Sequence, residues 1–359
     1  MSEERELASR LVERIAVEAK RIGRPVKVME VCGTHTVELR RQGIHSLLPE
    51  NVTMVSGPGC PVCVTPAGYI DTAVALARGG QALIATFGDM LKVPGTDGVA
   101  LSSLLGTGTV RLLYSPNELP ALARASKLPV VFLAIGFETT IPTVVSALLE
   151  AREQGIANLL LYTAFRVVCP ALRYLLSDPQ NGIDAFLLPG HVSVILGTDA
   201  YRFLEDEGGR PGVVTGFEPL DMLLGILMSL RQVSRGQRRV ENAYPRAVRP
   251  NGSPVARAVM ERALEPADQR WRGIGVIPGG ALKLRKELRD ADASVRFSLP
   301  EPRDHEAPGC LCSSVIAGKA RPPQCAHFGK RCTPDSPVGP CMVSSEGTCA
   351  AYFRYGADR

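Results

Sequence analysis

The chain has 359 residues, 45% of them hydrophobic, which is enough for two or three domains with buried cores. Its net charge of +5 comes without a long basic run and with only 5% aromatic residues, so we expect no nucleic-acid-binding face. Residues 1–23 mix charged and apolar side chains at helical spacing, which excludes a signal peptide or a membrane span there and predicts a cytoplasmic protein without membrane contact.

Short apolar runs alternate with segments of helical period from residue 26 to about residue 235, a pattern typical of βαβ units and parallel sheets. The pattern predicts an α/β fold, and the chain is long enough for two doubly wound domains. One further strand and turn are expected within 271–280. The main strands are expected at residues 26–31, 52–56, 82–87, 110–115, 129–135, 159–164, 184–189 and 212–216.

A proline-containing segment at 115–120 suggests a boundary between two domains of about four strands each. From Pro300 onward, Pro, Gly and Cys dominate. Such a segment has too few large apolar residues to form a core, so we expect a metal cluster to stabilise it. We therefore expect four regions: an N-terminal helix (1–24) packed on the C-terminal domain, a first α/β domain (25–115), a second (116–238), and a small cysteine-rich domain (239–359).

The positions of the ten cysteines point to chemistry, because a reducing compartment keeps structural disulfides rare. Six fall in the last 50 residues and three near the start, while Cys169 stands alone on the apolar face of an expected helix and is predicted to be core.

Cys32 directly follows the first expected strand, in MEVCGTHT, so it lies where ligands bind to open parallel sheets. A thiolate at the start of the next helix is a better nucleophile and metal ligand. The structural alternative is a small buried cysteine beside a capping threonine. His35 belongs to the same turn.

Cys60 and Cys63 form a Cys-x2-Cys pair after the second expected strand, in SGPGCPVCVTP. This spacing suits a redox disulfide or a shared metal, and the alternative is one half of a structural zinc site.

Two further motifs, GFETT (136–140) and PGHVS (189–193), also follow expected strands. Glu138 could cap a helix or act as an acid or base. His191 could carry protons, bind metal or serve as a polar turn residue. The sequence contains no phosphate-binding loop and no dinucleotide fingerprint, so no motif supports a nucleotide role.

The C-terminal cysteines can supply a zinc site or an iron–sulfur cluster, although their spacing matches neither common pattern. An extra dithiol beside four further thiolates favours an electron-carrying cluster over zinc. In chain order these residues are Cys310, Cys312, Cys325, Cys332, Cys341 and Cys349.

Together these motifs resemble the HypD family of nickel–iron hydrogenase maturation proteins. The resemblance spans nearly the whole chain, and its five motifs occur in the family's order. They are MEVCGTHT followed by Gly43-Ile44, GPGCPVC with Pro66, GFETT with Pro142, PGHVS with Ile195 and Gly197, and CTP followed by PVGPCMVSSEGTCAAY up to Tyr352.

The resemblance implies two α/β domains facing a cleft, a third domain with a 4Fe-4S cluster, and a scaffold with redox activity rather than a conventional turnover enzyme. The scaffold assembles an iron that carries two cyanides and one carbon monoxide, together with the chaperone HypC, and HypE delivers cyanide. We expect a monomer when the chain is alone.

The same resemblance assigns roles to residues. Cys32 would bind the iron with His35 beside it, Cys60 and Cys63 would be a redox dithiol, and Glu138 and His191 would line the cleft. The 4Fe-4S ligands would be Cys325, Cys332, Cys341 and Cys349, with Cys310 and Cys312 as a relay dithiol.

Two other functions would use the same cysteines. An iron–sulfur-dependent thiol–disulfide oxidoreductase would act on a dithiol substrate and would not need Cys32. A zinc-stabilised interaction protein would contain zinc and no labile sulfide.

Overall fold

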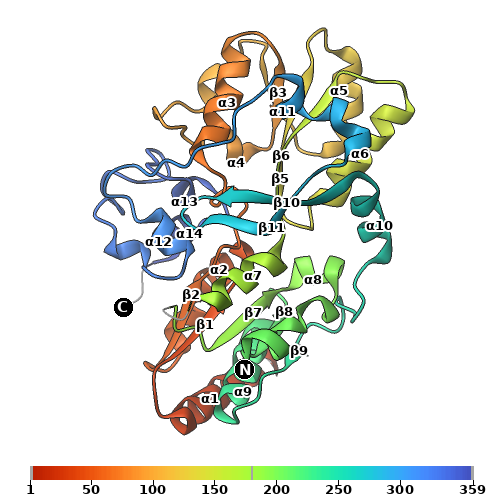
Figure 1. The fold of residues 1–359 in the computed structure, drawn as a ribbon. Coiled ribbons are helices and arrows are strands. Elements are labelled where there is room, and N and C mark those ends of the chain that lie inside the picture. Colours follow the sequence, from red (N-terminus) through yellow and green to blue (C-terminus); the bar gives the residue numbers. More distant parts are fainter. Residues whose placement is uncertain (1–2, 179–180, 357–359) are drawn as a thin grey trace.

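A computed structural model describes residues 3–178 and 181–356, and Figure 1 shows its two sheets, one above the other. The predicted fold class is confirmed: both sheets are mainly parallel, helices pack against them, and a cysteine-rich segment follows. None of the described helices is both long and apolar enough to cross a membrane.

The first sheet contains five parallel strands in the order β2-β1-β7-β8-β9. Its members share short apolar runs, and β7 is buried along its whole length, as expected for a parallel strand covered on both faces. The strands are β1 (Val26–Glu30), β2 (Val52–Ser56), β7 (Ala185–Pro189), β8 (Gly212–Thr215) and β9 (Val240–Asn242).

The second sheet has the order β10-β11-β6-β5-β3-β4, in which an antiparallel hairpin joins the edge of four parallel strands. Strand β5, with the sequence VVFLAIG, is buried throughout and forms the middle of this sheet. The strands are β3 (Leu83–Thr86), β4 (Val110–Leu112), β5 (Val130–Gly136), β6 (Leu159–Arg166), β10 (Leu264–Trp271) and β11 (Gly275–Leu284).

The helices pack on the sheets through their own apolar faces, which follow from the helical spacing of their apolar residues. Helix α1 buries Leu11, Ile15 and Ala19, which recur every four residues and therefore share one face. The remaining helices of the two sheets are α2 (Gly33–Arg41), α3 (Ala67–Arg78), α4 (Gly88–Leu91), α5 (Leu119–Ala125), α6 (Ile141–Glu153), α7 (Val168–Ser177), α8 (Gly190–Leu196), α9 (Pro219–Ser234) and α10 (Pro254–Ala263), and α1 itself is Glu3–Ile22.

The predicted division at residue 115 is wrong for the sheets, because the chain passes between them three times. Strands β1 and β2 lie in the same sheet as β7 to β9, whereas β3 to β6 belong to the other sheet. A buried parallel strand carries little local information about its neighbour, since every strand presents apolar residues on both faces.

Two other expected arrangements also differ from the structure. Among the described residues, helix α1 packs against α9 of the first sheet, and its apolar cluster contains no residue after Ala243. The strand and turn expected within 271–280 are present as the turn 272–274 and the start of β11, but β10 and β11 belong to the second sheet rather than to a cysteine-rich domain. Residues 240–242, which the predicted domain also included, form β9 of the first sheet.

A continuous apolar core joins the two sheets. It contains Phe186 and Val214 from the first sheet, Val131 and Leu160 from the second, and the disulfide formed by Cys60 and Cys63. The loops that follow the strands of both sheets therefore meet in the middle of the molecule.

The cysteine-rich segment lies beside this middle region (Figure 1). Its last helix packs on α2, where the guanidinium of Arg40 lies 3.4 Å from the centre of the Tyr352 ring. The short helices of this C-terminal part are α11 (Ala293–Arg296), α12 (Cys312–Ile316), α13 (Pro340–Val343) and α14 (Thr348–Tyr355).

Candidate functional site

Cys32 lies between the end of β1 and the start of α2, as the sequence predicts. It occupies the N-cap position with extended backbone angles and no side-chain capping bond, and it remains a free thiol with 9% of its surface exposed. Burial is the main cause that raises the pKa of this thiol to about 12; the nearby charge of Glu346 acts in the same direction, and the backbone N–H groups of His35 and Thr34 act in the opposite one. The free thiol is thus protonated at neutral pH, and a bound cation would favour its thiolate.

The Cys32 turn is packed directly against the loop of the Cys-x2-Cys pair. The N–H of Gly33 donates to the carbonyl of Gly59 at 3.2 Å. A Cβ atom at Gly59 would lie 2.4 Å from the backbone nitrogen of Cys32, a distance that no side chain can occupy. The glycine before Cys60 therefore permits this close approach.

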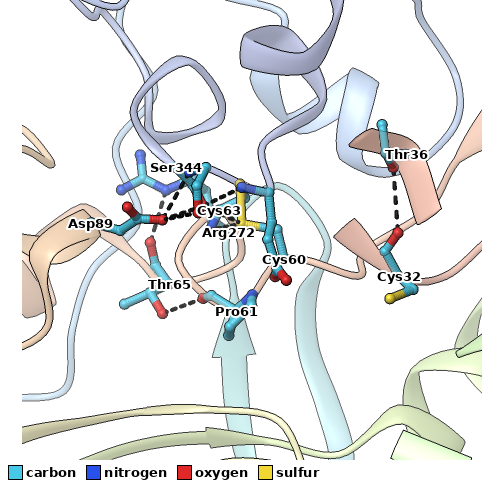
Figure 2. Close-up of a disulfide and its surroundings, with 11 residues drawn as sticks. Cys32, Thr36, Cys60, Pro61, Cys63, Thr65, Asp89, Arg272 and Ser344 are labelled. Carbon is cyan, nitrogen blue, oxygen red and sulfur yellow. Dashed lines mark hydrogen bonds between the residues drawn. A yellow bond between two sulfur atoms is a disulfide. The ribbon is translucent and has the colours of Figure 1, made fainter. Parts of the chain in front are cut away.

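Cys60 and Cys63 are joined as a buried disulfide. Figure 2 shows Ser344 above it, and the hydroxyl oxygen of Ser344 is 3.3 Å from Sγ of Cys60. Asp89 holds this contact in place, because its carboxylate accepts hydrogen bonds from the Ser344 hydroxyl at 3.1 Å and from the N–H of Ser345 at 2.8 Å.

The next residue of the same segment reaches the Cys32 turn. Glu346 accepts a 2.8 Å hydrogen bond from the hydroxyl of Thr34, and its side chain lies against Gly33. Residues 344–346 stand between Cys341 and Cys349 in the sequence. One short segment of the cysteine-rich region thus contacts both N-terminal thiol sites.

All six C-terminal cysteines line one small cavity, whose other walls include the apolar side chains of Val315, Phe328 and Met342. Within it, neighbouring thiols interact in the order Cys310, Cys312, Cys341 and Cys349, and each raises or lowers the pKa of the next. Six thiols around one apolar-walled space provide the donors that an iron–sulfur cluster requires. Around no single point in residues 3–178 and 181–356 do three or more His, Cys, Asp or Glu side chains converge as one metal ion would need.

His35 is fully buried and is fixed by the first sheet. Its Nε2 lies 3.1 Å from the carbonyl oxygen of Thr215 and 3.0 Å from that of Gly216, so this nitrogen carries the proton. Burial lowers the pKa of His35 to about 4, and the ring is therefore neutral at pH 7.

Phe217 is a residue that the sequence analysis did not select. Its ring stacks on His191, with centroids 3.8 Å apart, and lies 4.7 Å from the ring of His35. The structure thus brings the two predicted histidines into contact with one aromatic ring. The Gly-Phe-Glu sequence at 216–218, which repeats that at 136–138, is the signal that could have identified it.

Glu138 is buried on the side of the second sheet. One carboxylate oxygen accepts a 2.9 Å hydrogen bond from the N–H of Val168 at the start of α7, and the other has no hydrogen-bond partner among the described residues. Burial raises the pKa of Glu138 to about 7. Cys169, predicted as core, is half-buried beside this region and packs against the central core.

Replacing Glu138 with Gln is expected to change the pH dependence of stability. A carboxyl with a folded-state pKa near 7 and an ordinary value of 4.5 stabilises the fold below pH 4.5, and this contribution is lost as the pH rises through 7. Relative to wild type, the Glu138→Gln protein should gain on the order of 3 kcal/mol between pH 4.5 and pH 8. Denaturant unfolding across this range measures the difference, and parallel curves for the two proteins would contradict it.

Glu30 is a second buried carboxyl that the sequence analysis did not select. It lies two residues before Cys32 and accepts a 2.5 Å hydrogen bond from the hydroxyl of Thr36. Burial raises the pKa of Glu30 to about 8. A charged residue inside the apolar strand VKVMEV was the available signal.

Comparisons with known proteins identify the family of this chain. The family HypD, described as "Hydrogenase formation hypA family", matches residues 6–356. The chain belongs to the HypD family. It is 42% identical to the hydrogenase maturation factor HypD of Escherichia coli K12 over 92% of this chain and 90% of that protein.

Two further relatives extend the similarity. The HypD maturation factor of Rhizobium leguminosarum is 43% identical over 92% of this chain and 88% of its own. The HypD maturation factor of Cupriavidus necator is 40% identical over 98% of this chain and 95% of its own. Membership of the HypD family supports a role for this chain in hydrogenase maturation, and it confirms the resemblance noted from the motifs.

Proposed function

We propose that this chain is the scaffold and redox protein on which the iron group with two cyanides and one carbon monoxide is assembled for nickel–iron hydrogenases. The observation that carries the proposal is the contact made by residues 344–346, which touch the Cys60–Cys63 disulfide through Ser344 and the Cys32 turn through Glu346. A site for the iron and a source of electrons are thus joined through one short segment.

In this proposal Cys32 binds the iron, which is the cargo, together with a HypC-type chaperone, and HypE donates the cyanide. Cys32 is the one free thiol of the three N-terminal cysteines, and thiolate is the soft ligand that iron with cyanide and carbonyl ligands favours. His35 and His191 contact Phe217 beside this turn, where a neutral imidazole can accept or donate a hydrogen bond.

Cys325, Cys332, Cys341 and Cys349 are proposed to hold a 4Fe-4S cluster, with Cys310 and Cys312 as a neighbouring dithiol. The cluster, when bound, would supply single electrons. Ser344 and Asp89 hold the segment after Cys341 against the disulfide, and Cys60 and Cys63 accept two electrons when their S–S bond is reduced. The free thiols further suggest a reducing, cytoplasmic location.

The wild-type chain, produced anaerobically with a HypC-type chaperone and HypE, tests the proposal. Infrared spectra of the purified complex should contain the stretching bands of iron-bound cyanide and carbon monoxide. Absence of these bands in iron-replete preparations, together with turnover of a dithiol substrate, would favour the thiol–disulfide oxidoreductase. A colourless protein with zinc and no sulfide would favour the zinc-stabilised interaction protein.

A further inference from the structure

A buried arginine lies between the disulfide loop and the cysteine-rich segment. Arg272 begins the turn between β10 and β11, and only 5% of its surface is exposed. Its backbone N–H donates to the carbonyl of Val64 at 2.7 Å, and its Nε donates to the carbonyl of Thr65 at 2.9 Å (Figure 2). These two acceptors follow Cys63 directly, so Arg272 anchors the end of the disulfide loop.

The same turn contacts the cysteine-rich side. Nη1 of Arg272 donates to the carbonyl of His305 at 3.1 Å. Gly273 has a φ of +71°, and a Cβ atom there would lie 2.2 Å from Cβ of Ser313, the residue after Cys312. Arg272 also lines a surface cavity whose wall includes Cys310 and Cys312. The hairpin turn therefore lies between the loop that follows Cys63 and the segment that contains Cys310 and Cys312.

The charge of Arg272 has no carboxylate partner among the described residues. Three of its N–H groups meet backbone carbonyls, and Nη2 has no hydrogen-bond partner in the part of the chain that the structure describes. Two acids of the neighbouring segment are exposed and accept hydrogen bonds from backbone N–H groups: Asp304 from Gly273 and Glu306 from Ser313. A buried cation balanced only by dipoles stabilises any anion that forms beside it.

We infer that Arg272 is a positioning residue for the Cys60–Cys63 pair. Arg272 holds the loop after Cys63, and its buried charge favours the reduced form of the pair. Reduction breaks the S–S bond and leaves two electrons on the sulfurs, so that a thiolate can form on one of them. With glutathione as the reductant, two glutathione thiols lose one electron each and join as a disulfide. One of their protons goes to the second cysteine and the other to solvent.

This inference rests on the proposed redox role of the pair, and it is tested on the full chain without iron cargo. Wild type and variants are equilibrated anaerobically in glutathione buffers, and the reduced fraction of Cys60 and Cys63 is read by alkylation and mass spectrometry. The Arg272→Gln change should lower the equilibrium constant for reduction about tenfold, which is ~30 mV for a two-electron couple. Arg272→Lys, which keeps the charge, should recover most of this loss.

Arg270→Gln is the matched control, because Arg270 is exposed on the same hairpin, and it should leave the equilibrium unchanged. If the Arg272→Gln and Arg272→Lys changes alter the equilibrium constant for reduction equally, or if neither alters it, the proposed role of the charge is overturned. A wild-type disulfide that no glutathione ratio reduces would instead refute the redox function itself and this inference with it.

A second measurement needs no change at Arg272. In a Cys63→Ser protein, the pH dependence of Cys60 alkylation should give a pKa below the ordinary thiol value of about 8.5. A value at or above 8.5 would overturn the inference even if the Arg272→Gln protein fails to fold.

Discussion

A Cys32→Ser protein, purified anaerobically with its HypC-type chaperone and HypE, is expected to lack the infrared bands of iron-bound cyanide and carbon monoxide. The hydroxyl is a harder and far less acidic ligand than the thiol, so it does not replace sulfur on low-spin iron. Serine is also a favoured residue at a helix start, so the turn between β1 and α2 should keep its structure. The infrared bands should therefore be absent, whereas the thermal stability of the protein should fall only slightly.

The Cys169→Ser protein is the matched control for this experiment. Cys169 is also a free, largely covered thiol, but it lies in α7 and is bonded only weakly, with its sulfur 3.6 Å from the carbonyl oxygen of Ala200. Its infrared bands should equal those of wild type. Undiminished bands in the Cys32→Ser protein would show that Cys32 is not the iron ligand. If the bands are lost while the chaperone still co-purifies, the change has removed the iron and not the partner.

Replacement of Cys341 with Ala is expected to remove the iron–sulfur cluster. Anaerobic wild-type protein should contain about four irons and four sulfides per chain, and a dithionite-reduced sample should give an electron paramagnetic resonance signal. Cys341 is buried in the same cavity, next to Cys312 and Cys349, so its replacement removes one of the four proposed thiolate ligands from the centre of the site. Iron and sulfide should both fall close to zero.

The Cys310→Ala protein serves as the comparison. Cys310 lies next to Cys312 and also lines the surface cavity beside Arg272, which suits a relay thiol better than a cluster ligand. It should retain iron and sulfide. If Cys310→Ala loses the cluster while Cys325→Ala keeps it, the proposed set of four ligands is wrong, and Cys310 takes the place of Cys325.

The positions of the candidate site residues were largely predictable, because each follows a strand with a clear apolar pattern. Cys32 follows β1, Glu138 follows β5, and His191 follows β7, as the alternation of strands and helices indicated. What these residues contact was not predictable. Glu346 and Thr34 are 312 residues apart, and their hydrogen bond depends on how α14 packs on α2.

Residues without an unusual local pattern were missed. Arg272 lies in the segment where a strand and a turn were expected, but only the pairing of β10 with β11 reveals that it begins the turn between them. Phe217 lies in a Gly-Phe-Glu sequence that repeats the one at 136–138, but its contacts with two histidine rings depend on how α2, α8 and the end of β8 pack together.

The α/β fold and the membership of the HypD family could be predicted from the sequence, because local periodicity specifies strands and helices and the motifs are long and unusual. How the strands are shared between the sheets, and that six cysteines surround one cavity, became visible only in the folded molecule. The tertiary structure also decided that residues 344–346 connect this cavity to Cys32 and to the disulfide. The physical reason is the same in each case: burial and hydrogen bonding join segments that are far apart in the chain, and no local pattern records which distant segment will supply the partner.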